Sequence, residues 1–146
     1  MPFKAQKLLI AYDNTRGHCG RVAGRMVRML EDRAFGVECL PISTGDEQVD
    51  LDDFDGLVLG IPVLGLGRQA GVTAPMRKFV DGLDDLDEMR VALFVVYEFR
   101  HSTALERFSR FVEDEGAEIV GGRLYKAFSV GDQEHELPTE CMIRIR

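Results

Sequence analysis

The chain has 146 residues, of which 18 are lysine or arginine and 25 are aspartate or glutamate, so its formal charge is −7 at neutral pH. This length is that of a single domain that can bury a core without disulfide or metal staples. An acidic chain repels the phosphates of nucleic acids, so we expect no nucleic-acid partner. No apolar stretch reaches the roughly 20 residues of a membrane-spanning helix. We therefore expect a soluble, cytoplasmic protein that does not bind a membrane.

The cysteines and histidines do not form a metal-binding pattern. The three cysteines are far apart and include no Cys-x-x-Cys pair, and the three histidines are equally scattered. We expect reduced thiols and no metal site. The residues concerned are Cys19, Cys39 and Cys141, with His18, His101 and His135.

Hydrophobic periodicity predicts a strand and then a helix at the start of the chain. The strand is expected over residues 7–12, and it ends at the turn-forming pair Asp13 and Asn14. Apolar residues at helical spacing over 22–30 predict a helix that ends near Gly36.

Two strands are expected next, joined by a short acidic connection. The first covers residues 37–42, where Pro41 lacks the amide donor of a central strand and so favours the sheet edge. The acidic turn 50–55 then leads into a buried strand over 57–61, which the chain leaves through Pro62.

The second helix and the fourth strand follow. Pro75 suits the first turn of a helix, and apolar residues over 76–83 provide its buried face. The longest apolar run, residues 91–96, predicts the fourth strand.

A third helix is expected to begin near residue 103. Ser102 or Thr103 can cap it, and Glu106 lies three residues after Thr103, as in a capping box. Gly116 is expected to end this helix.

A fifth strand is expected over 117–120 or over 124–128. Alternating strands and helices imply parallel strands joined by right-handed crossovers, with helices on both faces. The predicted fold class is therefore α/β with a doubly wound parallel sheet. We expect one domain over 1–146, in which residues 129–146 form an atypical tail.

Three unusual loops are expected at the carboxyl ends of the strands, where such sheets bind ligands. Loop 13–20 precedes a helix, whose amino end can bind an anion. Loop 62–74 is rich in glycine, and loop 97–103 carries aromatic side chains that could stack on a flat ring. Glycines also serve simply to turn a chain, and arginine and aromatic residues are also ordinary surface and core residues. Both interpretations stay open at this point.

The sequence of these loops resembles that of the flavodoxin family. The similarity lies in segments 12–19 and 55–65 and in the fourth expected strand. Gly60, Pro62 and Gly65 match the family's Gly-Ser-Pro-Thr-aromatic-Gly segment. The resemblance implies a five-stranded sheet in the order 2-1-3-4-5, with flavin mononucleotide (FMN) held by the three loops. It covers nearly the whole chain up to the tail.

The resemblance also implies which residues hold the cofactor. No catalytic residue is assigned. The expected cofactor-binding residues are Asn14, Thr15, Arg16, Gly17, His18 and Cys19 in the first loop, Pro62, Val63, Leu64 and Gly65 in the second, and Tyr97, Phe99 and His101 in the third.

Several of these positions differ from the family pattern. Asn14, Arg16 and Cys19 replace hydroxyl residues of the phosphate-binding loop, although a guanidinium also binds phosphate strongly. Leu64 takes the place of a ring-stacking aromatic residue. The segment 97–100 carries bulky side chains where the family has small residues and glycine, so these side chains could fill the flavin slot.

The leading functional prediction is an FMN protein in electron transfer or small-molecule redox chemistry. Its partner would be a redox protein or a small quinone-like substrate, and a flavin-dependent oxidoreductase is one form of this prediction. The alternative is a cofactor-free binding or assembly module with the same fold.

A minor alternative is a cysteine-dependent phosphatase. Cys19 and Arg25 have the Cys-x5-Arg spacing of such enzymes, in which a thiolate attacks phosphorus. The helix amino end, Arg16 and Arg21 predict a lowered pKa for the Cys19 thiol.

The tail predicts a dimer. Flavodoxins close with a helix over the sheet, whereas residues 129–146 contain Gly131 and Pro138 and alternate like a strand at their end. We expect a second subunit to cover the sheet face that this helix would otherwise cover.

Overall fold

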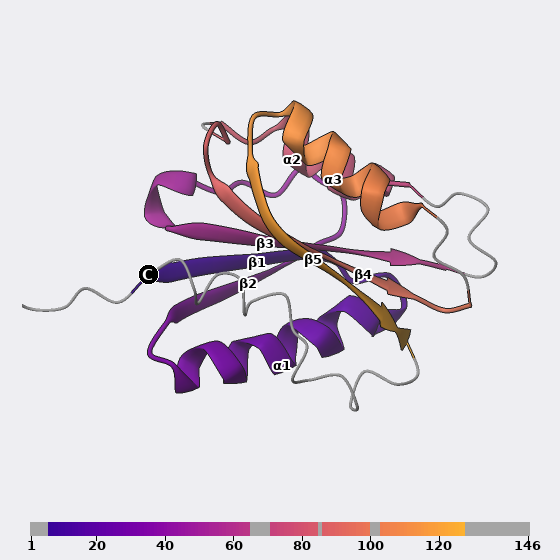
Figure 1. Cartoon of the computed structure of the whole chain (residues 1–146), viewed down its shortest axis with the longest axis horizontal. Coiled ribbons are helices and arrows are strands. Elements are labelled where there is room, and N and C mark those ends of the chain that lie inside the picture. Colours follow the sequence, from indigo (N-terminus) through magenta and orange to yellow (C-terminus); the bar gives the residue numbers. More distant parts are fainter. Residues whose placement is uncertain (1–5, 65–70, 85, 100–102, 128–146) are drawn as a thin grey trace, which may run out of the picture.

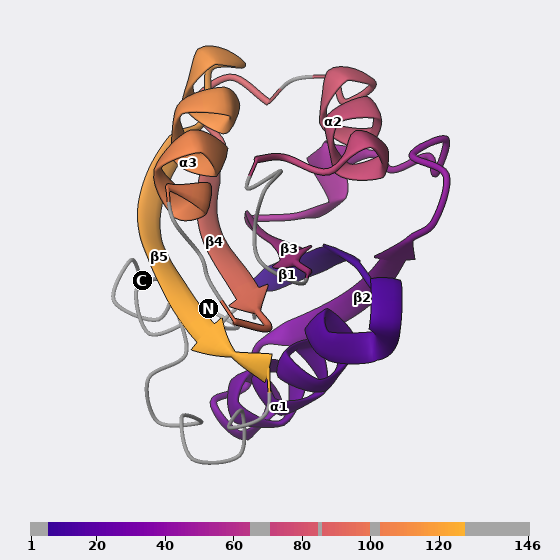
Figure 2. The same cartoon turned by 90° about the vertical axis from the view of Figure 1, so that its right-hand side faces the viewer.

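The computed structural model describes residues 6–64, 71–84, 86–99 and 103–127. Five parallel strands form one sheet in the order β2-β1-β3-β4-β5, with α1 on one face and α2 and α3 on the other (Figures 1 and 2). This arrangement confirms the predicted fold class and strand order. The elements are β1 (Lys7–Asp13), η1 (Thr15–Gly17), α1 (His18–Asp32), β2 (Gly36–Ile42), η2 (Leu51–Asp53), β3 (Gly56–Val63), α2 (Ala74–Asp81), β4 (Arg90–Tyr97), α3 (Ala104–Asp114) and β5 (Glu118–Lys126).

The core lies on both faces of the central strands. All eight residues of β3 are buried, and so is every residue of β4 except Arg90 and Tyr97 at its ends. One cluster of apolar side chains packs the sheet against α1, and a second packs it against α2 and α3. A strand covered on both faces consists of a continuous apolar run instead of an alternating one. For this reason the sequence predicts β3 and β4 directly.

Both edges of the sheet agree with simple backbone constraints. β2 lies at one edge, as Pro41 predicts, and Pro41 pairs with Tyr12 of β1. At the other edge, β5 (Glu118–Lys126) is one strand that overlaps both of the ranges expected from the sequence, 117–120 and 124–128. Its register with β4 shifts between Val91 and Ala92, which marks a bulge or irregularity.

Pro62 lies inside β3, not after it as expected. β1 pairs with β3 only as far as Gly60, whereas the pairing of β3 with β4 continues to Val63 and Tyr97. Pro62 therefore lies beyond the part of β3 that pairs with β1, so the ladder with β1 loses no bond there.

Two helix ends differ from the sequence prediction. α1 ends at Asp32, because Ala34 adopts a left-handed conformation (φ 67°) and the Phe35 amide donates back to the Leu30 carbonyl at 3.0 Å. An alanine in this role leaves no glycine signal in the sequence. At α3, Thr103 is the N-cap residue, but its side chain makes no capping hydrogen bond, so the expected capping box is absent.

The tail, 129–146, lies outside the described residues, and the dimer stays a prediction. Within the part of the chain that is described, none of the helices combines the length and apolar character needed to span a bilayer.

Close packing between β3 and β4 generates the first prediction. A Cβ atom added to Gly60 would overlap the ring of Phe94, which is fully buried and cannot move outward. We expect Gly60→Ala to lower the free energy of unfolding by about 1–3 kcal/mol. Urea denaturation followed by circular dichroism measures this change.

The matched control is Gly24→Ala on α1. A Cβ at Gly24 has nothing within 4 Å, so this variant keeps its stability or gains up to about 1 kcal/mol from helix propensity. Equal stability of the two variants would contradict the proposed overlap.

Candidate functional site

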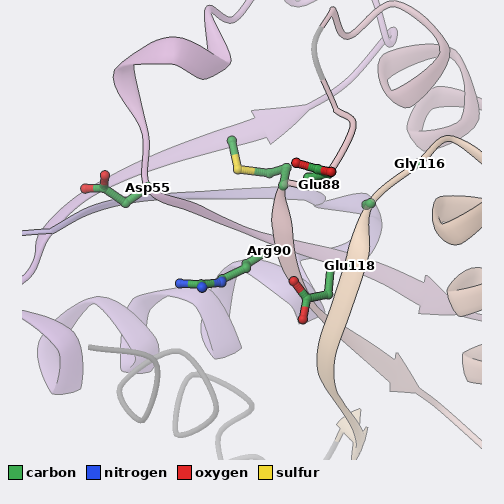
Figure 3. Close-up of a pocket in the computed structure, with 7 residues that line it drawn as sticks. Asp55, Glu88, Arg90, Gly116 and Glu118 are labelled. Carbon is green, nitrogen blue, oxygen red and sulfur yellow. The ribbon is translucent and has the colours of Figure 1, made fainter.

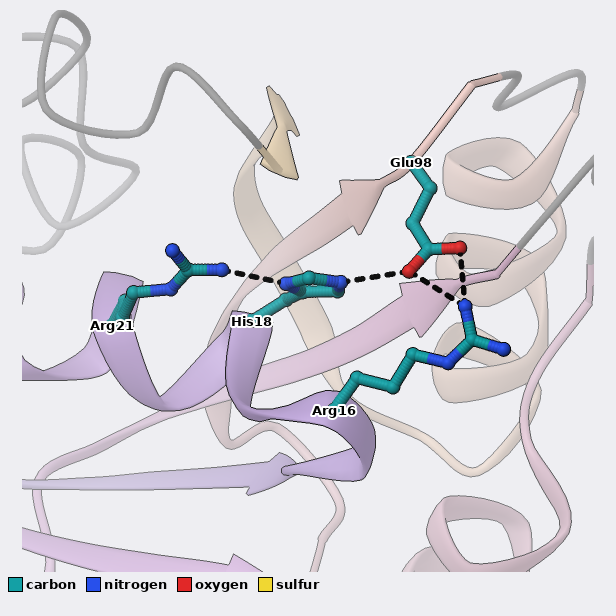
Figure 4. A network of polar contacts seen from close by, with 4 residues as sticks. All are labelled: Arg16, His18, Arg21 and Glu98. Carbon is teal, nitrogen blue, oxygen red and sulfur yellow. Dashed lines mark hydrogen bonds and ion pairs between the residues drawn. The ribbon is translucent and has the colours of Figure 1, made fainter.

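The ends of β3 and β4 and the loop after β1 meet at the carboxyl edge of the sheet. Glu98, the first residue after β4, donates its backbone amide to the Val63 carbonyl at the end of β3, at 3.0 Å. Its side chain extends to the loop after β1 (Figure 4). Glu98 therefore connects all three segments.

The Glu98 carboxylate accepts hydrogen bonds from two side chains of the first loop. Arg16 Nη1 lies 2.7 Å from Oε1 and 2.8 Å from Oε2, and His18 Nε2 lies 2.9 Å from Oε2. The Glu98 side chain is only 6% exposed, whereas that of Arg16 is 58% exposed. A carboxylate buried this deeply requires a cation and hydrogen-bond donors, and Arg16 and His18 supply them.

The backbone of the first loop is shaped for this contact. Arg16 and Gly17 both have left-handed φ angles, 62° and 75°. Glycine adopts this region freely, but for arginine it is unfavourable by about 1 kcal/mol. The ion pair with Glu98 holds Arg16 in this conformation.

Arg21 fixes the protonation of His18. Its Nη2 lies 2.8 Å from His18 Nδ1, and a guanidinium can only donate, so Nδ1 is the unprotonated acceptor. His18 is therefore a neutral imidazole with its proton on Nε2, which donates to Glu98. Figure 4 shows the resulting row from Arg21 through His18 to Glu98, with Arg16 on the far side of the carboxylate.

Two further groups of this loop are satisfied within the chain. The buried Asp13 carboxylate accepts from the amide and the hydroxyl of Thr15, at 3.1 and 2.6 Å. The Asn14 side chain accepts from the Gly20 amide at 2.9 Å, so this amide of the first turn of α1 is already bonded. At the amino end of α1, Arg16 therefore pairs with Glu98, Arg21 bonds to His18, and Asp13 bonds to Thr15.

The other expected site residues follow β3 and β4 or lie at the ends of these strands, and they differ in burial. Pro62 and Val63 are buried in β3, Leu64 and Tyr97 are half-buried, and Phe99 is 63% exposed. Gly65 and His101 lie outside the described residues.

Comparisons with known proteins find likeness in structure only. No family model matches the chain, and no curated protein matches it. Similar solved structures are the two-electron reduced flavodoxin of Megasphaera elsdenii (TM-score 0.73, 18% identity, 94% of this chain and 98% of that one) and oxidised flavodoxin 2 of Bacillus cereus (0.70, 20%, 93% and 95%). The protein has the flavodoxin-like fold.

A larger protein contains the same fold as one part. The flavodiiron core from Synechocystis matches with a TM-score of 0.67 and 13% identity, over 96% of this chain but 36% of that one. At these identities the comparisons establish the fold, and the chemistry must be argued from the residues of the site.

Within this flavodoxin-like fold, Glu98 is the site residue that the sequence analysis did not select. It belongs to the bulky segment 97–100, but its charge was given no role. One signal was present: a lone carboxylate directly follows an apolar central strand, at the edge where ligands bind. Its partners, 80 and 82 residues earlier, were not predictable from spacing.

The prediction of a lowered pKa for the Cys19 thiol is wrong. The thiol is completely buried, and burial raises its pKa well above the ordinary value, with the nearby Asp13 carboxylate raising it further. These effects outweigh the helix amino end and the arginines, which bond to Glu98 and His18 instead. A buried, protonated thiol cannot attack a phosphate ester, so the structure does not support the phosphatase alternative.

A hollow lies at the opposite, amino edge of the sheet (Figure 3). It has a volume of about 540 Å³ and is lined by Asp55, Glu88, Met89, Arg90, Gly116, Ala117 and Glu118. The described residues include no group of histidine, cysteine and acidic side chains that could hold a metal ion. Since parallel sheets bind ligands at their carboxyl edge, we place the candidate site at Glu98.

Thiol reactivity tests the position of Cys19. In a Cys141→Ser background, we expect a disulfide reagent such as DTNB to modify one thiol of the native protein at pH 8, the exposed Cys39. In guanidinium chloride it should modify two, because unfolding exposes Cys19. A Cys39→Ser variant of this background should show none in the native state. Rapid native labelling of Cys19 would contradict its burial.

The tautomer of His18 is a second testable feature. Nitrogen-15 NMR of the imidazole should show Nδ1 without a proton and Nε2 with one at neutral pH. Replacing Arg21 with Ala removes the donor to Nδ1, so the Nδ1 resonance of the variant should shift from its position in the unaltered protein. A proton on Nδ1 in the unaltered protein would contradict the row of hydrogen bonds.

Proposed function

We propose that the protein binds FMN at the carboxyl edge of its sheet and takes part in electron transfer. The observation that carries the proposal is the set of Glu98 contacts, which join the ends of β3 and β4 to the arginine-bearing first loop. The structural neighbours support it, since flavodoxins of this fold are described in oxidised and two-electron reduced states.

The donor groups at the amino end of α1 suit a phosphate. Arg16 and Arg21 carry guanidinium groups, which bind phosphate oxygens in pairs, and the helix amino end adds partial positive charge. Arg16 is more than half exposed and therefore accessible from solvent. These donors fit the phosphate of FMN once the Arg16 guanidinium is released from Glu98.

The other end of the site suits a flat ring. Among the described residues, the exposed large hydrophobic side chain is Phe99, which directly follows Glu98. An aromatic side chain at the rim can cover one face of a ring and exclude water, and Leu64 offers a half-buried apolar surface. When bound, the flavin supplies the group that accepts and donates electrons.

The charge of the chain indicates the kind of partner. A formal charge of −7 attracts a positively charged redox protein and accelerates its association, more so at low ionic strength. A small uncharged quinone-like substrate would not depend on this field. An electron-transfer rate that does not change with ionic strength would therefore favour the small substrate.

A cofactor-free binding module is the second candidate. It is favoured by the Glu98 carboxylate, which already pairs with Arg16, one of the two cations that would hold a phosphate. In this case the carboxyl edge would be a structural ion pair and not a ligand site.

Flavin titration distinguishes the two candidates. The chain has no tryptophan, so the fluorescence of the flavin itself is the signal to follow. We expect FMN fluorescence to change on binding, and Phe99→Ala to weaken binding about tenfold, which corresponds to one aromatic contact of about 1.4 kcal/mol. Phe99→Tyr keeps the ring and is the matched control. Unchanged FMN fluorescence at millimolar protein would support the cofactor-free module.

A further inference from the structure

We propose that the Glu98 carboxylate is an intramolecular competitor for the phosphate position, and that it sets how strongly this site discriminates FMN from riboflavin. The inference rests on the proposed flavin binding. It concerns a residue outside the set expected to hold the cofactor, and it follows from the contacts of the network.

The contacts of Glu98 are those that a bound anion would make. Its two oxygens lie 2.7 and 2.8 Å from Arg16 Nη1, and Oε2 also lies 2.9 Å from His18 Nε2. Carboxylate and phosphate oxygens use the same guanidinium donors. A phosphate that takes Arg16 Nη1 must therefore displace the Glu98 side chain.

Charge balance makes this competition consequential. The first loop and Glu98 together hold two arginines, Arg16 and Arg21, and two carboxylates, Glu98 and the buried Asp13, so they have no excess positive charge when His18 is neutral. A phosphate that entered beside an intact ion pair would gain little attraction and would be repelled by both carboxylates. Riboflavin, which lacks the phosphate, leaves the ion pair undisturbed.

The side chain of Glu98 can leave without moving the strand. Its amide is held to Val63 at the end of β3, so the backbone has its own anchor. Arg16 is exposed on its solvent side, which gives an incoming anion access to the guanidinium. The expected consequence is that FMN and riboflavin bind the unaltered protein with dissociation constants within about tenfold of each other.

The test compares the two flavins on a charge-neutral variant. Glu98→Gln keeps the shape of the side chain but removes its charge, so we expect FMN affinity to rise at least tenfold while riboflavin affinity changes less than twofold. Glu113→Gln, an exposed glutamate in the last turn of α3, is the matched control and should change neither. Equal gains for both flavins, or no gain for FMN, would overturn the proposal.

A second measurement does not depend on flavin binding. Inorganic phosphate that binds only the folded state raises the thermal midpoint. We expect phosphate to raise the midpoint of Glu98→Gln more than that of the unaltered protein at matched ionic strength. If no flavin binds either protein but phosphate shows this difference, the flavin proposal fails and the competition stands. If phosphate shows no difference either, the competition fails as well.

A shorter carboxylate provides the test should Glu98→Gln fold poorly. Glu98→Asp keeps the charge but withdraws it from Arg16 by one methylene, so FMN affinity relative to riboflavin should rise by severalfold. Circular dichroism confirms the fold of each variant before titration. An unchanged ratio of the two affinities in Glu98→Asp would overturn the proposal.

Discussion

The burial of the central strands on both faces is the constraint from which the site follows. β3 exposes none of its residues and β4 exposes little, so helices must cover both sides of the sheet. Parallel strands with helical crossovers bring all their carboxyl ends to one edge. The ends of β3 and β4 and the loop after β1 consequently meet there, although they are far apart in the chain. Glu98 lies at this meeting point because it is the first residue beyond the apolar run of β4.

The buried Glu98 carboxylate requires compensating groups from the first loop. Removing Glu98 from water is unfavourable by several kcal/mol unless its charge is compensated. Arg16 provides the compensation by adopting a left-handed backbone conformation, and His18 by holding its proton on Nε2. Under the proposed function the same network governs phosphate binding, because Arg16 and Arg21 are already bonded to Glu98 and His18. The balance between a flavoprotein and a cofactor-free module therefore depends on how readily one side chain leaves one guanidinium.

Much of the fold could be predicted from the sequence, because its signals are local. Continuous apolar runs mark β3 and β4, Pro41 marks an edge strand, and the alternation of strands and helices implies the parallel sheet. The errors arose where a local signal was missing or was overridden. Ala34 follows α1 in a left-handed conformation that glycine usually adopts. Pro62 can lie within β3 because the pairing of β3 with β1 has already ended at Gly60.

The candidate site was predictable only in outline. Periodicity and residue type were enough to predict the fold class, the carboxyl edge as the place of the candidate site, and the cations of the first loop. Only the tertiary structure decided that Glu98 faces Arg16 and that Cys19 is sealed in the core. The physical reason is that both facts depend on solvent exclusion and on contacts across about 80 residues. The sequence shows which groups are present, but not which of them are buried from solvent in the folded chain.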